Sequence, residues 1–235
     1  MKVTGSFRKN LIVVGVGATG SNLVALLSQL AVSKKEIEEI ILIDGDKVEE
    51  KNFKNQKFTI KDIDKNKAEV LANRYEKLGI KISYIDKYIE SDIEIIELLK
   101  SVSEYTMPIL IGCVDNNKCR RILNDAFEKY KDTLIYIDAG NGDIERKGQV
   151  VLGYKRIDQI ISEPVVKYYP NILEDEEDEV NKYKCSRIDE HPQQFVTNVL
   201  SATSIFLMIN ALLEGEVPST YISFNVENFS IRGMN

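Results

Sequence analysis

Cysteine and histidine are scarce in this sequence. Among its 235 residues there are three cysteines, Cys113, Cys119 and Cys185, and one histidine, His191. An odd number of cysteines argues against a disulfide framework, and without a Cys-x-x-Cys pair the usual ligands of a structural zinc site are missing. We therefore expect a protein of the reducing cytoplasm.

Basic residues are not in excess either, because 31 Lys and Arg against 37 Asp and Glu give a net charge of −6. Affinity for nucleic acid depends on cations, so we expect no nucleic-acid partner. The N-terminus has no apolar stretch followed by a cleavage site, so we expect no signal peptide. The longest apolar stretch, residues 195–213, is interrupted by polar residues such as Asn198 and Asn210, and it predicts a buried helix with no membrane partner.

Short β-branched runs alternate with amphipathic segments over the first 140 residues. This alternation predicts an α/β fold with a Rossmann-like, mostly parallel sheet flanked by helices. The pattern changes after Gly148, which predicts a separate antiparallel C-terminal extension within a single domain, residues 1–235. The expected strands are 11–14, 40–43, 81–88, 109–111, 134–137, 149–154 and 221–226, and the expected helices are 21–32, 67–78, 93–99, 117–130 and 193–213.

Three glycines separate the first strand from the first helix in the pattern Gly15-x-Gly17-x-x-Gly20. Glycines there permit a tight turn and let backbone N–H groups approach a phosphate at the N-terminus of the helix. Asp44 ends the second strand, where a carboxylate holds the hydroxyls of a ribose. These residues predict a nucleotide site but leave ATP and NAD open.

Cations and a further carboxylate favour ATP. Asp115 ends the fourth strand, on the same sheet edge as Gly15 and Asp44, and could hold Mg²⁺. A nucleotidyl transferase must also neutralise a triphosphate, whereas a dehydrogenase has little use for such groups. The cations lie in the segment after Asp44 and are Lys54, Lys57, Lys65 and Lys67.

Several motifs, taken in order, resemble the ThiF/MoeB family, whose adenylating fold is shared with ubiquitin-activating enzymes. The resemblance covers nearly the whole chain. The matching segments are the loop Gly15-Val16-Gly17-Ala18-Thr19-Gly20, Asp44-Gly45-Asp46, Asn52-Phe53-Lys54-Asn55-Gln56, Lys67 early in a helix, Asp115-Asn116-Asn117, Gly148-Gln149-Val150, and Cys185 followed by Pro192-Gln193 and a long helix.

The resemblance implies an enzyme that uses ATP and Mg²⁺ to adenylate the C-terminal carboxylate of a small ubiquitin-like or sulfur-carrier protein with a Gly-Gly tail. It implies a homodimer. It also implies that Lys67 contacts the phosphates, Asp115 holds Mg²⁺ and Asp44 holds the ribose. The remaining residues expected to bind the nucleotide are Gly15, Gly17, Thr19, Gly20, Asp46, Asn52, Asn55 and Gln56.

Two residues bear on whether such an enzyme turns over. Asn55 stands where the family has an arginine and cannot supply its charge, although Lys54 or Lys57 could supply a point charge. Cys185, flanked by Lys184 and Arg187, is a candidate nucleophile for the activated tail. One alternative is a relative that binds nucleotide and a protein partner without catalysis. The other is a nicotinamide-dependent dehydrogenase.

Overall fold

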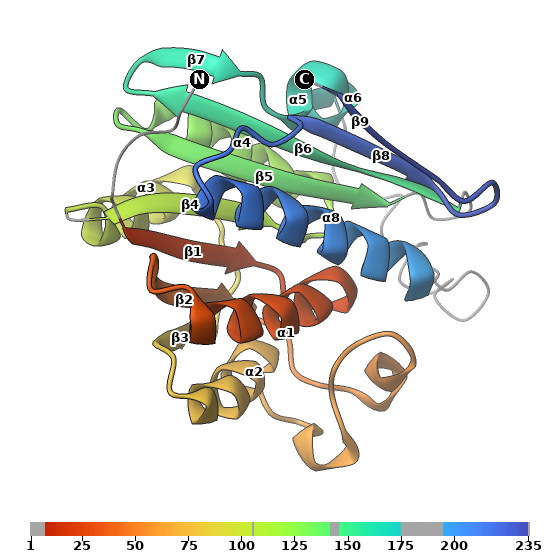
Figure 1. Ribbon diagram of the computed structural model, residues 1–235. Helices are drawn as coiled ribbons and strands as arrows, with labels where there is room; N and C mark the ends of the chain where they lie inside the picture. The colour runs from red at the N-terminus through yellow and green to blue at the C-terminus, as the bar shows by residue number, and fades with distance from the viewer. Residues whose placement is uncertain (1–7, 105, 142–145, 175–194, 235) are drawn as a thin grey trace.

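The computed structural model describes residues 8–104, 106–141, 146–174 and 195–234 (Figure 1). A single sheet organises them, and its main path runs in the order β3-β2-β1-β4-β5-β6-β8-β9, with β7 paired to β6. The strands are β1 (Arg8–Val14), β2 (Ile37–Ile43), β3 (Ile82–Ile85), β4 (Thr106–Gly112), β5 (Leu134–Asn141), β6 (Lys147–Arg156), β7 (Gln159–Ser162), β8 (Tyr221–Asn225) and β9 (Ser230–Met234).

Strands β3, β2, β1, β4 and β5 are parallel, and helices connect them. The helices are α1 (Ala18–Ser33), α2 (Lys67–Tyr75), α3 (Asp92–Val102), α4 (Asn117–Lys129), α5 (Val165–Tyr168), α6 (Asn171–Glu174) and α8 (Phe195–Leu213). The fold class predicted from the alternation of strands and helices is confirmed.

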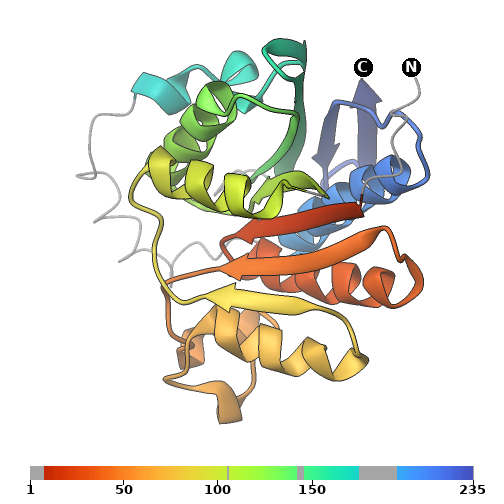
Figure 2. The same cartoon turned by 90° about the vertical axis from the view of Figure 1, so that its left-hand side faces the viewer.

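Alternate residues of β1 enter different cores because side chains of a strand point to opposite faces in turn. Leu11 and Val13 pack with α1, α2 and α8, whereas Ile12 and Val14 pack with α3 and α4. Figure 2 shows these two helical layers on either side of the sheet. Burial on both faces explains why the central strands read as continuous apolar runs rather than as alternating ones.

The sequence pattern predicts a separate antiparallel extension. In the structure the antiparallel strands instead belong to the main sheet. β6 pairs with β5 from Leu134 opposite Lys155 to Asn141 opposite Gly148, so the antiparallel part continues the same sheet. β8 then pairs with β6, and β9 pairs with β8. The sequence pattern did not predict β7, β9, α5 or α6, which are all short.

The segment between β2 and α2 contains two short 3₁₀ helices, Glu50–Lys54 and Ile60–Asp62. Each begins with reciprocal side-chain and backbone hydrogen bonds, between Glu49 and Asn52 in the first and between Thr59 and Asp62 in the second. Arg74 of α2 lies 2.6 Å from Asp62 and fixes the second turn to the body of the protein. The segment therefore has regular local structure and is anchored to α2.

Helix α8 is the one helix of the described residues that is long and apolar enough to span a bilayer, and 56% of its most apolar window is buried inside the protein. Ala202, Ile205, Met208 and Ile209 enter the core shared with α1 and the sheet. This packing agrees with the buried helix expected from the sequence.

Candidate functional site

The C-terminal ends of β1, β2 and β4 bring Gly15, Asp44 and Asp115 to one edge of the sheet. Gly15 follows β1 and donates its N–H to Ile43 O of β2 at 2.8 Å, while Cys113 donates to Val14 O at 2.8 Å. Asp44 follows β2, and Asp115 lies just beyond β4. Open α/β sheets bind ligands at this edge.

Steric limits explain two of the three loop glycines. Gly15 has φ +83°, and a Cβ atom on it would lie 2.8 Å from the carbonyl oxygen of Cys113. A Cβ atom on Gly20 would lie 2.0 Å from the carbonyl oxygen of Gly15, so only glycine fits there. Gly17 is different, because a Cβ atom there would meet only Gln56, at 3.9 Å. The loop therefore packs tightly against the protein at Gly15 and Gly20 and has free space beside Gly17.

The N-terminus of α1 has the properties of an anion site. Gly17 caps the helix without a side-chain hydrogen bond, and its first turn holds no acidic residue. Uncapped N–H groups and the helix dipole both favour a negative ligand such as a phosphate. The loop residues predicted to bind nucleotide, Gly15 to Gly20, surround this end of the helix.

Asp44 is fixed beside the glycine loop. Its Oδ2 accepts the N–H of Val16 at 2.8 Å, and its Oδ1 accepts the N–H of Asp46 at 2.8 Å. Burial raises the pKa of the carboxyl group, while the two backbone N–H groups and the charge of Lys67 lower it in part. The carboxylate thus has one orientation next to the loop, as a group that holds a ribose requires.

Lys67 is the first residue of α2 and is buried, with 7% of its side chain exposed. A cation at a helix N-terminus opposes the helix dipole, and burial adds a desolvation cost. Asp46 offsets both, because its Oδ2 lies 2.8 Å from Lys67 Nζ. Folding alone gives no reason for a lysine here, so its position indicates a function.

Tyr88, which follows β3, is hydrogen-bonded to the other carboxylate oxygen of Asp46. Its hydroxyl donates to Asp46 Oδ1 at 2.5 Å. The ring lies against Gly45, where a Cβ atom would come within 2.7 Å of ring atoms. An open groove of about 480 Å³ lies beside this contact and is lined by Gly45, Asp86, Lys87, Tyr88, Glu90 and Glu94.

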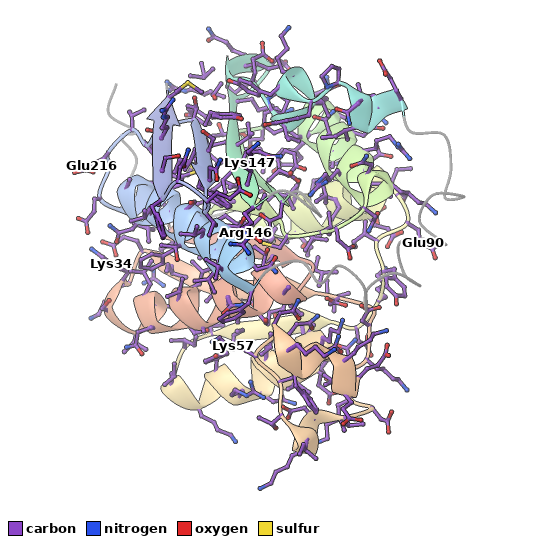
Figure 3. The ribbon with its side chains drawn as sticks, turned by 90° about the vertical axis from the view of Figure 1, so that its right-hand side faces the viewer. Lys34, Lys57, Glu90, Arg146, Lys147 and Glu216 are labelled. Atoms are coloured by element: carbon purple, nitrogen blue, oxygen red, sulfur yellow. The ribbon has the colours of Figure 1, made fainter. Side chains whose placement is uncertain are left out.

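Residues 52–57 lie across the first turns of α1. Gln56 faces Gly17, and the N–H of Lys57 bonds Ser21 Oγ at 3.1 Å. Lys57 Nζ lies 5.8 Å from the ring centre of Phe195, at the start of α8, and Figure 3 shows Lys57 below that helix. Asn52 is used locally, because its Oδ1 accepts the N–H of Glu49 at 2.8 Å. The nucleotide contacts predicted for Asn52, Asn55 and Gln56 stay predictions.

Asp115 is exposed just before α4, whose N-cap is Asn116. Among the described residues no group of three or more His, Cys, Asp or Glu could hold a metal ion as a protein cage. Mg²⁺ does not need one, since it commonly binds one or two carboxylates together with phosphates and water. The donor set fits a magnesium ion that arrives with a nucleotide.

The sequence pattern missed a polar cluster behind the glycine loop. Asn198 Oδ1 of α8 accepts from Thr19 Oγ1 at 3.0 Å and from Asn141 Nδ2 at 2.8 Å. Ser201 Oγ donates to Asn141 Oδ1 at 2.5 Å. The signal was present in the polar residues that interrupt α8, which recur at helical spacing on its buried face.

A second missed group joins the ends of β4 and β5. Arg120 Nε lies 3.3 Å from Asp138 Oδ1, and Arg120 also donates to the carbonyl groups of Val114 and Ala139. Tyr136 donates to the other oxygen of Asp138 at 3.0 Å. Burial raises the pKa of Asp138, and the guanidinium of Arg120 opposes that shift. This group holds the segment that carries Asp115.

The described cysteines are poor nucleophiles. Cys113 and Cys119 pack against the two cores, and burial raises the pKa of both thiols, that of Cys119 to about 12. Both side chains therefore serve as packing residues. Cys185, the predicted nucleophile, and His191 lie outside the described residues.

Comparison with solved structures finds proteins of the same fold. Escherichia coli MccB with ATP superposes with a TM-score of 0.65 at 21% identity, over 96% of this chain and 63% of that one. MccB with AMPCPP and MccA gives 0.66 at 19% identity, over 96% and 63%. PaaA gives 0.63 at 14% identity, over 95% and 62%. The chain thus spans less than two thirds of the length of these proteins.

No curated protein sequence matches the chain significantly. The sequence model of the ThiF family, in contrast, matches residues 7–226, which include the glycine loop, Asp44, Lys67 and Asp115. The resemblance seen in the ordered motifs is thereby confirmed, and the fold of the solved structures agrees with it. The chain belongs to the ThiF family.

Proposed function

We propose that this protein is an ATP-dependent adenylyltransferase that activates the C-terminal carboxylate of a small protein or peptide. One observation carries the proposal: an uncapped helix N-terminus, the fixed carboxylate of Asp44 and the buried cation of Lys67 lie at one edge of the sheet. Together they supply a phosphate cradle, a ribose ligand and a cation for a triphosphate.

In the proposed reaction a carboxylate oxygen of the acceptor attacks the α-phosphorus of ATP. The bond to the bridging oxygen breaks, pyrophosphate leaves with its electron pair, and an acyl-adenylate remains. The protein positions the two anions and offsets their repulsion. Lys67 and the N-terminus of α1 act on the phosphates, and Asp115 would hold Mg²⁺, which supplies further neutralising charge when bound.

The proposed acceptor is a ubiquitin-like or sulfur-carrier protein with a Gly-Gly tail, as the family resemblance implies. The solved MccB structures suggest a second acceptor class, because they include complexes with MccA and with N-formylated MccA. Cys185 is proposed to take over the activated tail, and the protein is proposed to act as a cytoplasmic homodimer. Its activity on either acceptor is testable without identifying the pathway.

Pyrophosphate exchange tests the proposal. The purified protein is incubated with ATP, Mg²⁺, labelled pyrophosphate and either a Gly-Gly-ending carrier or a short peptide acceptor. We expect label to enter ATP only with an acceptor and to be lost in Lys67→Met. Lys77→Met, which removes an exposed lysine after α2, is the matched control. If the folded protein shows no pyrophosphate exchange with either acceptor class, the proposed adenylyltransferase activity is wrong.

Asn55 supports a second candidate, a nucleotide-binding module that recognises a partner without turnover. An amide cannot neutralise a triphosphate as the family's arginine does. This candidate predicts tight ATP binding without exchange, and exchange restored by Asn55→Arg. The first candidate predicts exchange in the wild-type protein.

A further inference from the structure

Lys67 can act on a phosphate only if its ammonium is held in place. Its flexible side chain loses rotamer entropy when fixed in one direction. The only ion-pair partner found among the described residues is Asp46, at 2.8 Å. Backbone contact supports the same pair, because the N–H of Lys67 donates to the carbonyl oxygen of Asp46 at 2.9 Å.

Asp46 is a weak anchor by itself. Its side chain is 48% exposed, so water competes for the oxygen that faces Lys67. A carboxylate held at one oxygen can rotate about its Cβ–Cγ bond and carry the ammonium with it. The orientation of Asp46 therefore needs a second contact.

Tyr88 supplies that contact. Its hydroxyl donates to Asp46 Oδ1 at 2.5 Å, whereas Lys67 occupies Oδ2. Rotation of the carboxylate would break one of the two bonds. The ring in turn lies against Gly45, where a Cβ atom would come within 2.7 Å of ring atoms. Gly45, Tyr88, Asp46 and Lys67 thus form a continuous chain of contacts that leads from β3 to α2.

We propose that Tyr88 is a positioning residue, which fixes the carboxylate of Asp46 and thereby aims the ammonium of Lys67 at the phosphates of ATP. The inference rests on the proposed function, because it assigns Lys67 to the phosphates. Tyr88 itself touches neither the base nor the ribose in this assignment. It acts on phosphate binding alone.

Paired binding measurements test this assignment. Dissociation constants for ATP and for adenosine are measured by calorimetry on the wild-type protein and on Tyr88→Phe, which keeps the ring on Gly45 and removes only the hydroxyl. Losing a hydrogen bond to a charged group that anchors Lys67 should weaken ATP binding about 10-fold. Adenosine has no phosphate, so its binding should not change. The matched control is Tyr84→Phe, on the exposed part of β3.

A double variant separates positioning from general structure. In Lys67→Met the ammonium is absent, so adding Tyr88→Phe should weaken ATP binding no further. Equal loss of ATP and adenosine binding would overturn the inference by placing Tyr88 on the nucleoside, and so would unchanged ATP binding. A wild-type protein that binds no ATP, or binds it equally well as Lys67→Met, would overturn the proposed function as well.

Discussion

Thr19 Oγ1 of the glycine loop lies 3.0 Å from Asn198 Oδ1 of α8, across a separation of 179 residues. Both side chains are buried, with 7% and 1% exposed. The bond joins the edge of the sheet that carries the glycine loop to the long C-terminal helix. Asn141, at the end of β5, shares the same acceptor oxygen and completes the junction.

Replacing Asn198 by leucine should destabilise the protein through this junction. Leucine has a similar size but accepts no hydrogen bond, so the hydroxyl of Thr19 and the amide of Asn141 would lose their partner while buried. We expect the free energy of unfolding to fall by about 2–4 kcal/mol, measured by urea denaturation. Asn210→Leu, at a partly exposed position of the same helix, is the control. Equal effects at both positions would contradict the prediction.

Gly20 and Gly79 lie in different environments, so replacing each by alanine should cost a different amount of stability. Gly20→Ala places a Cβ atom 2.0 Å from a backbone oxygen, so the loop must open or α1 must shift. Gly79→Ala meets no atom within 4 Å and pays only for its φ of +76°. We expect the Gly79 variant to lose about 1 kcal/mol of stability and to bind ATP normally.

The Gly20 variant should lose more stability than the Gly79 variant and should also lose ATP binding. Thermal unfolding and calorimetry on the same samples provide the comparison. Wild-type ATP affinity in Gly20→Ala would show that the loop is not where the nucleotide binds.

The parallel half of the sheet could be predicted from the sequence because each buried strand is a short apolar run next to an amphipathic helix. The placement of Gly15, Asp44 and Asp115 at one edge of the sheet could be predicted because parallel strands place their C-terminal ends together. The continuous pairing of β6 with β5 could not, since a strand's partner depends on contacts distant in sequence. The hydrogen bonds of Asn198 and Arg120 could not be predicted for the same reason, because they too join residues that are distant in sequence.

Asp115 should matter for magnesium and not for folding. Its side chain is exposed, so Asp115→Asn should change the free energy of unfolding by less than about 0.5 kcal/mol. Loss of the charged ligand should reduce pyrophosphate exchange by about 100-fold and shift the magnesium dependence to higher concentration. Asp158→Asn, an exposed carboxylate at the opposite end of the sheet, is the control. An unchanged magnesium titration would contradict the assignment.

The titration of Tyr88 reports its bond to Asp46. The hydrogen bond to the Asp46 carboxylate raises the pKa of Tyr88 to about 12, and burial and the charge of Asp44 add to the shift. Because the folded state holds this proton more tightly, its stabilising contribution is complete below about pH 10, the usual tyrosine pKa. It is lost as the pH rises toward about 12.

Asp46→Asn removes the negative charge and should return the pKa of Tyr88 toward about 10. At pH 11 the variant should therefore show the ultraviolet absorbance of nearly one more tyrosinate than the wild-type protein. Tyr88→Phe, with and without Asp46→Asn, provides the blank that assigns the signal. Identical absorbance of the two proteins would mean that the bond does not form in solution.

The contact of Gly20 with the carbonyl oxygen of Gly15 has a thermodynamic consequence. In this loop a Cβ atom on Gly20 would overlap a backbone oxygen, so the loop is tightly packed. Its shape is therefore set during folding and not when a ligand binds. The conformational entropy of ordering the phosphate cradle is then absent from the binding step. If ATP binds as proposed, its affinity relies on few side chains, and a neutral Asn55 is compatible with binding of a triphosphate.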